Sequence, residues 1–88
     1  MRFCYTKKFC RDYARAGRRG KDTGKLDEIM DCLIHDKQLP PRCSDHELVG
    51  NFKGVRACHV TPDWLLLYTR SAEGVVFIAT GTHADLFR

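Results

Sequence analysis

The 88-residue sequence has no long hydrophobic run. No stretch approaches the roughly 18 apolar residues that a membrane-spanning helix needs. The opening residues, MRFCYTKKF, also lack the apolar segment of about 7 to 15 residues that a secretory signal requires. We therefore expect a cytoplasmic protein that does not act with a membrane.

The sequence also lacks a disulfide framework and a Cys-x-x-Cys motif. Its five cysteines are Cys4, Cys10, Cys32, Cys43 and Cys58. Their odd number and irregular spacing favour free thiols in a reducing compartment. The spacings Cys32-x-x-His35 and Cys43-x-x-His46 leave a zinc site as an alternative. We favour a protein without metal or cofactor, because Cys32 belongs to the apolar stripe of a predicted helix.

Acidic residues are scarce at the N-terminal end, so positive charge is concentrated there. Residues 1–25 hold nine basic side chains against two acidic ones, a net charge of +7. Residues 26–88 hold six basic and nine acidic side chains, a net charge of −3. A cationic block of this kind attracts a phosphate backbone, although it could also be a solvated helix face.

A first helix is predicted after a short β-prone run over residues 1–5. Thr6 is a candidate N-cap, and the helix should extend to about Arg19, with Gly17 and Gly20 marking its end. The spacing of the apolar residues places Phe9, Cys10, Tyr13 and Ala14 on one face.

A second helix is predicted to begin near Asp22 or Thr23 and to carry acidic residues in its first turns. At helical spacing it buries Leu26, Ile29, Met30, Leu33 and Ile34. Pro40 and Pro41 then forbid helix and impose an extended link before Ser44.

The second half of the chain is predicted to be mainly β-structure. Strand-like segments cover residues 48–52, 55–60, 64–70 and 75–80, and hairpin-length connections join the last three. Such neighbours should pair antiparallel, because a parallel return needs a dozen or more residues. The last residues, GTHADLFR, indicate one helical turn, because Thr82 and Asp85 have capping-box spacing. The predicted fold class is α+β, with two N-terminal helices packed on one face of a small, mainly antiparallel sheet.

Three histidines lie beside turns or strand ends, where reactive groups tend to occur. They are His46, His59 and His83. His59 is near the end of one predicted strand and Asp63 is in the turn before the next. His83 follows the next strand. The side chains of His59, Asp63 and His83 should therefore converge on one rim of the sheet.

This set of residue types suits metal-independent cleavage of RNA. One imidazole can remove the proton of a 2′-hydroxyl and another can protonate the leaving 5′-oxygen. Lys53 and Arg56 are candidate cations for the phosphate, and Trp64 or Phe87 could stack on an unpaired base.

Each of these residues also has a structural explanation. A single histidine is more often structural than catalytic, Trp64 begins an apolar strand, and Phe87 could seal the sheet. Arg56 and His59 have opposite parity along one strand, so a regular pleat sends them to opposite faces. Either a twist or bulge intervenes, or one of the two lies outside the site.

Two segments resemble the C-terminal half of YafQ-like toxins of the RelE/ParE superfamily. They are LPPRCSDHELVGNFKGVRACHVTPDWLLLY and GTHADLF, which together cover roughly residues 39–87. Members of the family show the pattern D-H-x-L-x-G-x-W/F-K-G-x-R-x-x-H-x-x-P-D-W and an ending G-T/S-H-x-x-L-F. A chain of 88 residues is predicted to form one domain, because lengths under about 100 residues rarely divide. With the resemblance, this becomes a single RelE-like toxin domain over residues 1–88.

The resemblance also implies a function and a site. The implied activity is that of an mRNA interferase that cuts messenger RNA in the ribosomal A site without a metal and is inactivated by a cognate antitoxin. The implied active-site residues are His46, His59, Asp63, Trp64, His83 and Phe87. Ribosomal RNA becomes the expected partner of the basic first helix.

We expect His83 to be the general acid, because its place at a helix N-terminus disfavours the imidazolium form. His46 or His59 would be the base, and Asp63 would orient one of them. Arg56 or Lys53 would hold the phosphate.

Two departures from the family pattern could change substrate contact, namely Val55 in place of a common tyrosine and Ala57 in place of a frequent acidic residue. Two other functions compete with the interferase. One is a ParE-like toxin that inhibits a topoisomerase, and the other is a catalytically silent module that binds only an antitoxin.

Overall fold

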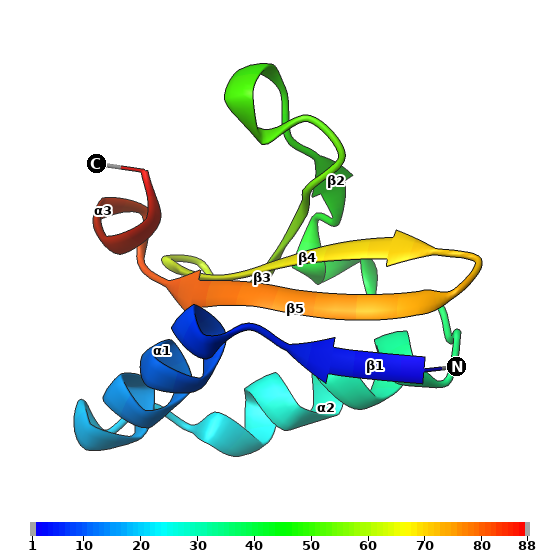
Figure 1. The fold of residues 1–88 in the computed structure, drawn as a ribbon. Coiled ribbons are helices and arrows are strands. Elements are labelled where there is room, and N and C mark those ends of the chain that lie inside the picture. Colours follow the sequence, from blue (N-terminus) through cyan, green and yellow to red (C-terminus); the bar gives the residue numbers. More distant parts are fainter. Residues whose placement is uncertain (1, 88) are drawn as a thin grey trace.

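A computed structural model of the chain describes residues 2–87. Two helices, α1 and α2, lie along one face of a five-stranded sheet whose strand order is β1-β5-β4-β3-β2 (Figure 1). In chain order the elements are β1 Arg2–Tyr5, α1 Lys7–Arg18, α2 Thr23–Ile34, the 3-10 turn η1 Pro41–Cys43, β2 His46–Glu47, the 3-10 turn η2 Gly50–Phe52, β3 Arg56–Thr61, β4 Trp64–Ser71, β5 Gly74–Gly81 and α3 His83–Leu86. The predicted α+β class is confirmed, while Met1 and Arg88 lie outside the described residues.

The first helix begins at the predicted cap. Thr6 Oγ1 accepts the Phe9 N–H at 2.9 Å and donates to the Ile78 carbonyl of β5 at 2.6 Å. One threonine therefore both caps α1 and ties it to the sheet.

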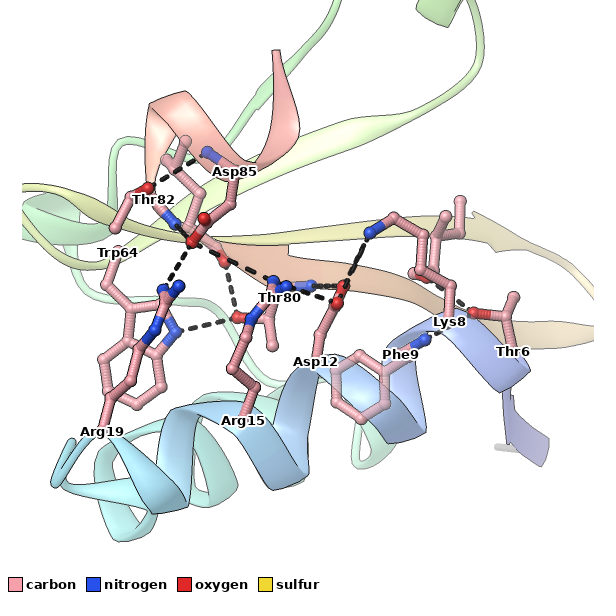
Figure 2. A network of polar contacts seen from close by, with 12 residues as sticks. Thr6, Lys8, Phe9, Asp12, Arg15, Arg19, Trp64, Thr80, Thr82 and Asp85 are labelled. Atoms are coloured by element: carbon pink, nitrogen blue, oxygen red, sulfur yellow. Dashed lines mark hydrogen bonds and ion pairs between the residues drawn. The ribbon is translucent and has the colours of Figure 1, made fainter. Parts of the chain in front are cut away.

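The predicted apolar face of α1 is partly wrong. Phe9 is buried as expected, but Cys10 and Ala14 are exposed, and Asp12 and Ala16 are buried instead. The reason is polar, because the Asp12 carboxylate accepts the backbone N–H of Thr80 at 3.2 Å inside the protein (Figure 2). A buried carboxylate needs hydrogen-bond partners. The helix is therefore oriented with Asp12 toward the sheet, and not with all four predicted apolar residues buried.

The second helix matches its prediction closely. Asp22 caps it by accepting the Gly24 N–H, and its buried residues are Leu26, Ile29, Met30 and Leu33, with Ile34 partly buried against them. The link after it differs from the expectation. Pro40 is extended, but Pro41 starts η1, because a proline at a first helical position has the required φ and lacks only an N–H that would be unpaired.

The strand predicted over residues 48–52 is also wrong. The chain there forms the short strand β2 followed by η2, and Gly50 has a φ of +72°, which a strand does not accommodate. The three strands β3, β4 and β5 form the predicted antiparallel meander.

One pairing was not predicted. Strand β1 pairs parallel to β5, with Arg2 opposite Gly74 and Tyr5 opposite Phe77. Gly74 has a φ of +151°, and a Cβ at this position would collide with the backbone of Arg2. Glycine therefore allows the first strand of the chain to lie against the last.

The two faces of the sheet have separate cores. On the helix side the largest buried side chains are Trp64, Tyr68 and Phe77. On the opposite face Ala57, Leu67 and Ala79 are covered by partly buried residues that include Leu86 of α3. All five cysteines are free thiols, as predicted, and Cys43 and Cys58 are buried. Within residues 2–87 there is no helix with the length and apolar character to span a membrane.

Candidate active site at the rim of the sheet

The end of β3, the β3–β4 turn and the end of β5 meet at one rim, because these strands run antiparallel. His59 lies near the end of β3, Asp63 in the turn, and His83 at the first position of α3. The His83 Nδ1 is 2.6 Å from the Asp63 Oδ1, and the backbone N–H of His83 donates to the same oxygen at 3.2 Å. The rings of His59 and His83 have centroids 6.0 Å apart. The sequence-predicted convergence of these three residues is present in the structure.

The contact with Asp63 gives His83 a defined orientation. The side chain and the backbone N–H of His83 hold the pKa of the Asp63 carboxyl below its ordinary value, so this group is ionised at neutral pH. A carboxylate can only accept hydrogen bonds, so Nδ1 of His83 must carry the proton in this contact. The Nε2 atom is then the ring nitrogen that remains for chemistry.

His59 has a different environment. Its Nδ1 atom is buried and has no hydrogen-bond partner among residues 2–87. His59 is also one of the residues that line a groove of about 510 Å³, together with Arg42, Ser44, Val60, Thr61 and Pro62. A buried polar atom without a partner is costly, and such atoms are concentrated at functional sites.

His46 lies on the same face of the sheet as His59. It is opposite Ala57 in the β2–β3 pair, and His59 is two residues further along β3. The His46 ring is exposed, and its Nδ1 lies 2.7 Å from the Ser44 carbonyl oxygen. Since a carbonyl only accepts, Nδ1 carries the proton here too, and Nε2 is the His46 nitrogen that is left as a possible base.

The two predicted cations occupy different places. Arg56 lies opposite Tyr68 and has the other parity from His59, and the register shift of β3 comes only after His59. Its guanidinium donates to Asp45 at 2.9 Å, which raises the pKa of Arg56, and the Tyr68 hydroxyl donates to the same carboxylate at 2.6 Å. The structure therefore does not bring Arg56 to the histidines.

Two other cations lie in the segments that precede β3. Lys53 is exposed in the loop between η2 and β3. Arg42 lines the groove beside His59 and was missed in the sequence, where its only signal was a positive charge in the loop before His46.

The two aromatic residues predicted to stack on a base lie in different environments, one in the core and one at the surface. Trp64 is 1% exposed and its Nε1–H donates to Thr80 Oγ1 at 2.9 Å, so it belongs to the core on the helix side. Phe87 is 38% exposed, and its ring lies 6.2 Å from the His83 ring and 5.6 Å from Phe52, edge to face. Phe52 was missed because residue 52 was assigned to a strand.

The predicted zinc alternative has no support in the geometry. Within the described part of the chain, no three histidine, cysteine or acidic side chains are grouped as metal ligands. Cys43 is packed in the core, where burial raises the pKa of its thiol.

The comparison with known families decides where the chain belongs. The model of the bacterial YafQ toxins of type II toxin-antitoxin systems matches residues 1–88. The chain belongs to the YafQ toxin family. The mRNA interferase toxin YafQ of Escherichia coli strain K12 is 42% identical over 84 residues, which cover 94% of this chain and 91% of that relative.

Solved structures of the YafQ family have the same fold. The crystal structure of YafQ from E. coli strain BL21(DE3) matches with a TM-score of 0.96 and 39% identity, over 99% of this chain and 98% of that one. The E. coli DinJ-YafQ toxin-antitoxin complex matches with a TM-score of 0.93 and 40% identity, over 99% of this chain and 97% of that one.

Proposed function

We propose that this protein is a ribosome-dependent endoribonuclease that cuts messenger RNA and so inhibits translation in the cytoplasm. The observation that carries the proposal is the meeting of His59, His83 and Asp63 at one rim, with the imidazole rings 6.0 Å apart. The proposal is also supported by membership of a toxin family whose E. coli member is named an mRNA interferase.

The proposed reaction is a transfer within one nucleotide. A neutral imidazole of His59 or His46 removes the 2′-hydroxyl proton, and the 2′-oxygen attacks the adjacent phosphorus. The bond from phosphorus to the 5′-oxygen breaks, and His83 donates a proton to that oxygen. The products are a 2′,3′-cyclic phosphate and a free 5′-hydroxyl. The contact of Nδ1 with the Asp63 carboxylate orients the His83 ring and leaves Nε2 as the nitrogen that donates in this step.

The negative charge that builds up on the phosphate needs a cation that is not already paired. Arg56 is held by Asp45, so its role in the proposal is to support the sheet edge beside the site. Lys53 and Arg42 are the proposed phosphate ligands, and Phe52 with Phe87 form the proposed surface for an unpaired base.

The proposed macromolecular partners are the ribosome with its message and a cognate antitoxin. E. coli YafQ is found in a complex with DinJ, which supports an antitoxin partner for this chain as well. Exposed cations of α1 suit contact with ribosomal RNA, and they include Lys7, Arg11 and Arg18.

The test is to map the ends of a translated message after incubation with purified protein and ribosomes, beside a lane of free RNA. We expect in-frame cuts that require ribosomes and that His83→Ala removes while the variant stays folded. A folded wild-type protein that makes no cut would contradict the proposal. Antitoxin binding and topoisomerase inhibition would then be measured to separate a silent binding module from a ParE-like toxin.

A further inference from the structure

Helix α3, which carries His83, is too short to hold its own position. It has four residues, His83–Leu86, and an isolated helix of one turn is not stable in water. Its place, and with it the place of the His83 ring, is therefore set by contacts to other elements. Asp63 supplies one of these contacts from the β3–β4 turn.

Asp85 supplies the second anchor of α3. Its carboxylate accepts the Thr82 N–H at 3.0 Å, and the Thr82 hydroxyl accepts the Asp85 N–H at 3.1 Å, which completes the capping box. The same carboxylate oxygen lies 2.9 Å from Arg19 Nη1 and 4.0 Å from Arg15 Nη2 (Figure 2). The hydrogen bond from the Thr82 backbone, together with Arg19, lowers the pKa of Asp85 to about 2.

One of these two arginines, Arg15, is itself fixed to the sheet through Asp12. The Asp12 carboxylate is 3.2 Å from Arg15 Nη2 and accepts the backbone N–H of Thr80 near the end of β5. Figure 2 shows the resulting chain of contacts from Thr80 at the end of β5, through Asp12 and Arg15 of α1, to Asp85 of α3.

The fit between α3 and the end of β5 is close. A Cβ placed on Gly81 would lie 2.9 Å from the Asp85 Cβ, nearer than real Cβ atoms come to a neighbour. Asp85 therefore packs directly over the backbone of Gly81, two residues before His83. Asp85 is two residues from His83 in a helix of four residues, so a shift of Asp85 also moves His83.

We propose that Asp85 and Arg19 are positioning residues for His83, and that their ion pair holds α3 so that the His83 ring faces His59. This inference rests on the proposed function, in which the His83 ring takes part in cleavage. It divides the basic helix into two roles. Arg15 and Arg19 pair with carboxylates of the same chain, whereas the side chains of Lys7, Arg11 and Arg18 are exposed and remain for RNA.

The inference is tested with Asp85→Asn, which removes the charge and nearly preserves the volume. The matched control is Glu28→Gln, which removes one negative charge from the exposed face of α2. We expect Asp85→Asn to lower the single-turnover rate of cleavage by about tenfold or more, with KM unchanged, because a small displacement of a catalytic group has a large effect on rate. Asp85→Glu should restore most of the rate, since glutamate is the usual residue at this position of a capping box.

A second readout does not depend on cleavage. In the isolated protein, the imidazole NMR signals of His83 and His59 should shift in Asp85→Asn, while those of His35 at the end of α2 stay in place. If Asp85→Asn does not fold, Arg19→Gln gives the same comparison with the capping box intact. Arg19→Gln and Asp85→Asn should not add in the double variant, because each removes the same contact.

The outcomes separate this inference from the function. A wild-type protein that does not cut would overturn the proposed function, while the NMR comparison would still decide the positioning role. Unchanged His83 signals in Asp85→Asn, or additive effects of the two substitutions, would overturn the positioning role and leave the interferase proposal standing.

Discussion

The Asp63 carboxylate and the His83 imidazole form a 2.6 Å contact between the β3–β4 turn and the first residue of α3. The contact makes the histidines of the rim unequal. His83 has an ionised partner on Nδ1, whereas Nδ1 of His59 is buried without a partner among the described residues. Environments that differ in this way allow one imidazole to act as acid and another as base.

The first prediction concerns Asp63. Asp63→Asn should lower the single-turnover cleavage rate by about 10²-fold or more, because an amide no longer fixes the orientation and tautomer of the His83 ring. The rate should be measured from pH 5 to 8 on ribosomes carrying a defined message. The lowered pKa of Asp63 keeps the wild-type carboxylate ionised throughout that range, so the loss should be present at every pH. Cleavage at the wild-type rate would remove Asp63 from the mechanism.

The second prediction separates the two cations that the sequence offered. Lys53→Ala should reduce the slope of log affinity against log salt by about 1, as expected for one lost phosphate contact. Arg56→Ala should leave that slope unchanged and lower the free energy of unfolding by about 1 kcal/mol, because Arg56 is paired with Asp45 in a half-exposed setting. Salt titrations of ribosome binding and urea unfolding give both quantities. A lower salt slope in Arg56→Ala, with an unchanged slope in Lys53→Ala, would show that Arg56 and not Lys53 contacts the phosphate.

The third prediction concerns Trp64, which the resemblance placed in the active site. Trp64→Phe should lower the free energy of unfolding by about 2 kcal/mol, because it leaves a cavity and removes the hydrogen bond to Thr80. Cleavage per folded molecule should stay near the wild-type value. Denaturant unfolding and active-fraction assays at low temperature test this. A stable variant with no activity would mean that the indole contributes directly.

The fourth prediction is a pH dependence of stability that comes from Asp85. Its pKa is about 2 in the folded protein against an ordinary value of 3.8, so its stabilising contribution is complete above about pH 4. The contribution is lost as the pH falls from about 4 to about 2, because the unfolded chain binds the proton first. The Tm of the wild type should therefore fall more steeply in this window than that of Asp85→Asn. Parallel curves of Tm against pH for the two proteins would show that the contacts of the Asp85 carboxylate do not stabilise the folded protein.

Local signals predicted much of the fold. Caps and helical spacing located α1 and α2, and turn lengths predicted the β3-β4-β5 meander, because these features depend on residues close in sequence. The family resemblance is confirmed across the whole chain. The parallel β1–β5 pair and the burial of Asp12 were missed, since both depend on partners more than sixty residues away.

The candidate site was predicted to a similar degree. Antiparallel topology alone was enough to bring His59, Asp63 and His83 together, and their catalytic roles stay a prediction. Strand parity raised the doubt about Arg56, but the sequence could not reveal that Asp45 would pair with it. Phe52 was missed because the positive φ of Gly50 turns the chain there, and a run of apolar residues does not encode that turn.

The parallel pairing of β1 with β5 also has a consequence for biosynthesis. The strand that is made first, Arg2–Tyr5, finds its partner only when Gly74–Phe77 has left the ribosomal exit tunnel. Contacts between the ends of a chain form late and slowly, because the intervening loop must close first. The β1–β5 pair is therefore expected to be the last part of the sheet to form, after the β3-β4-β5 meander.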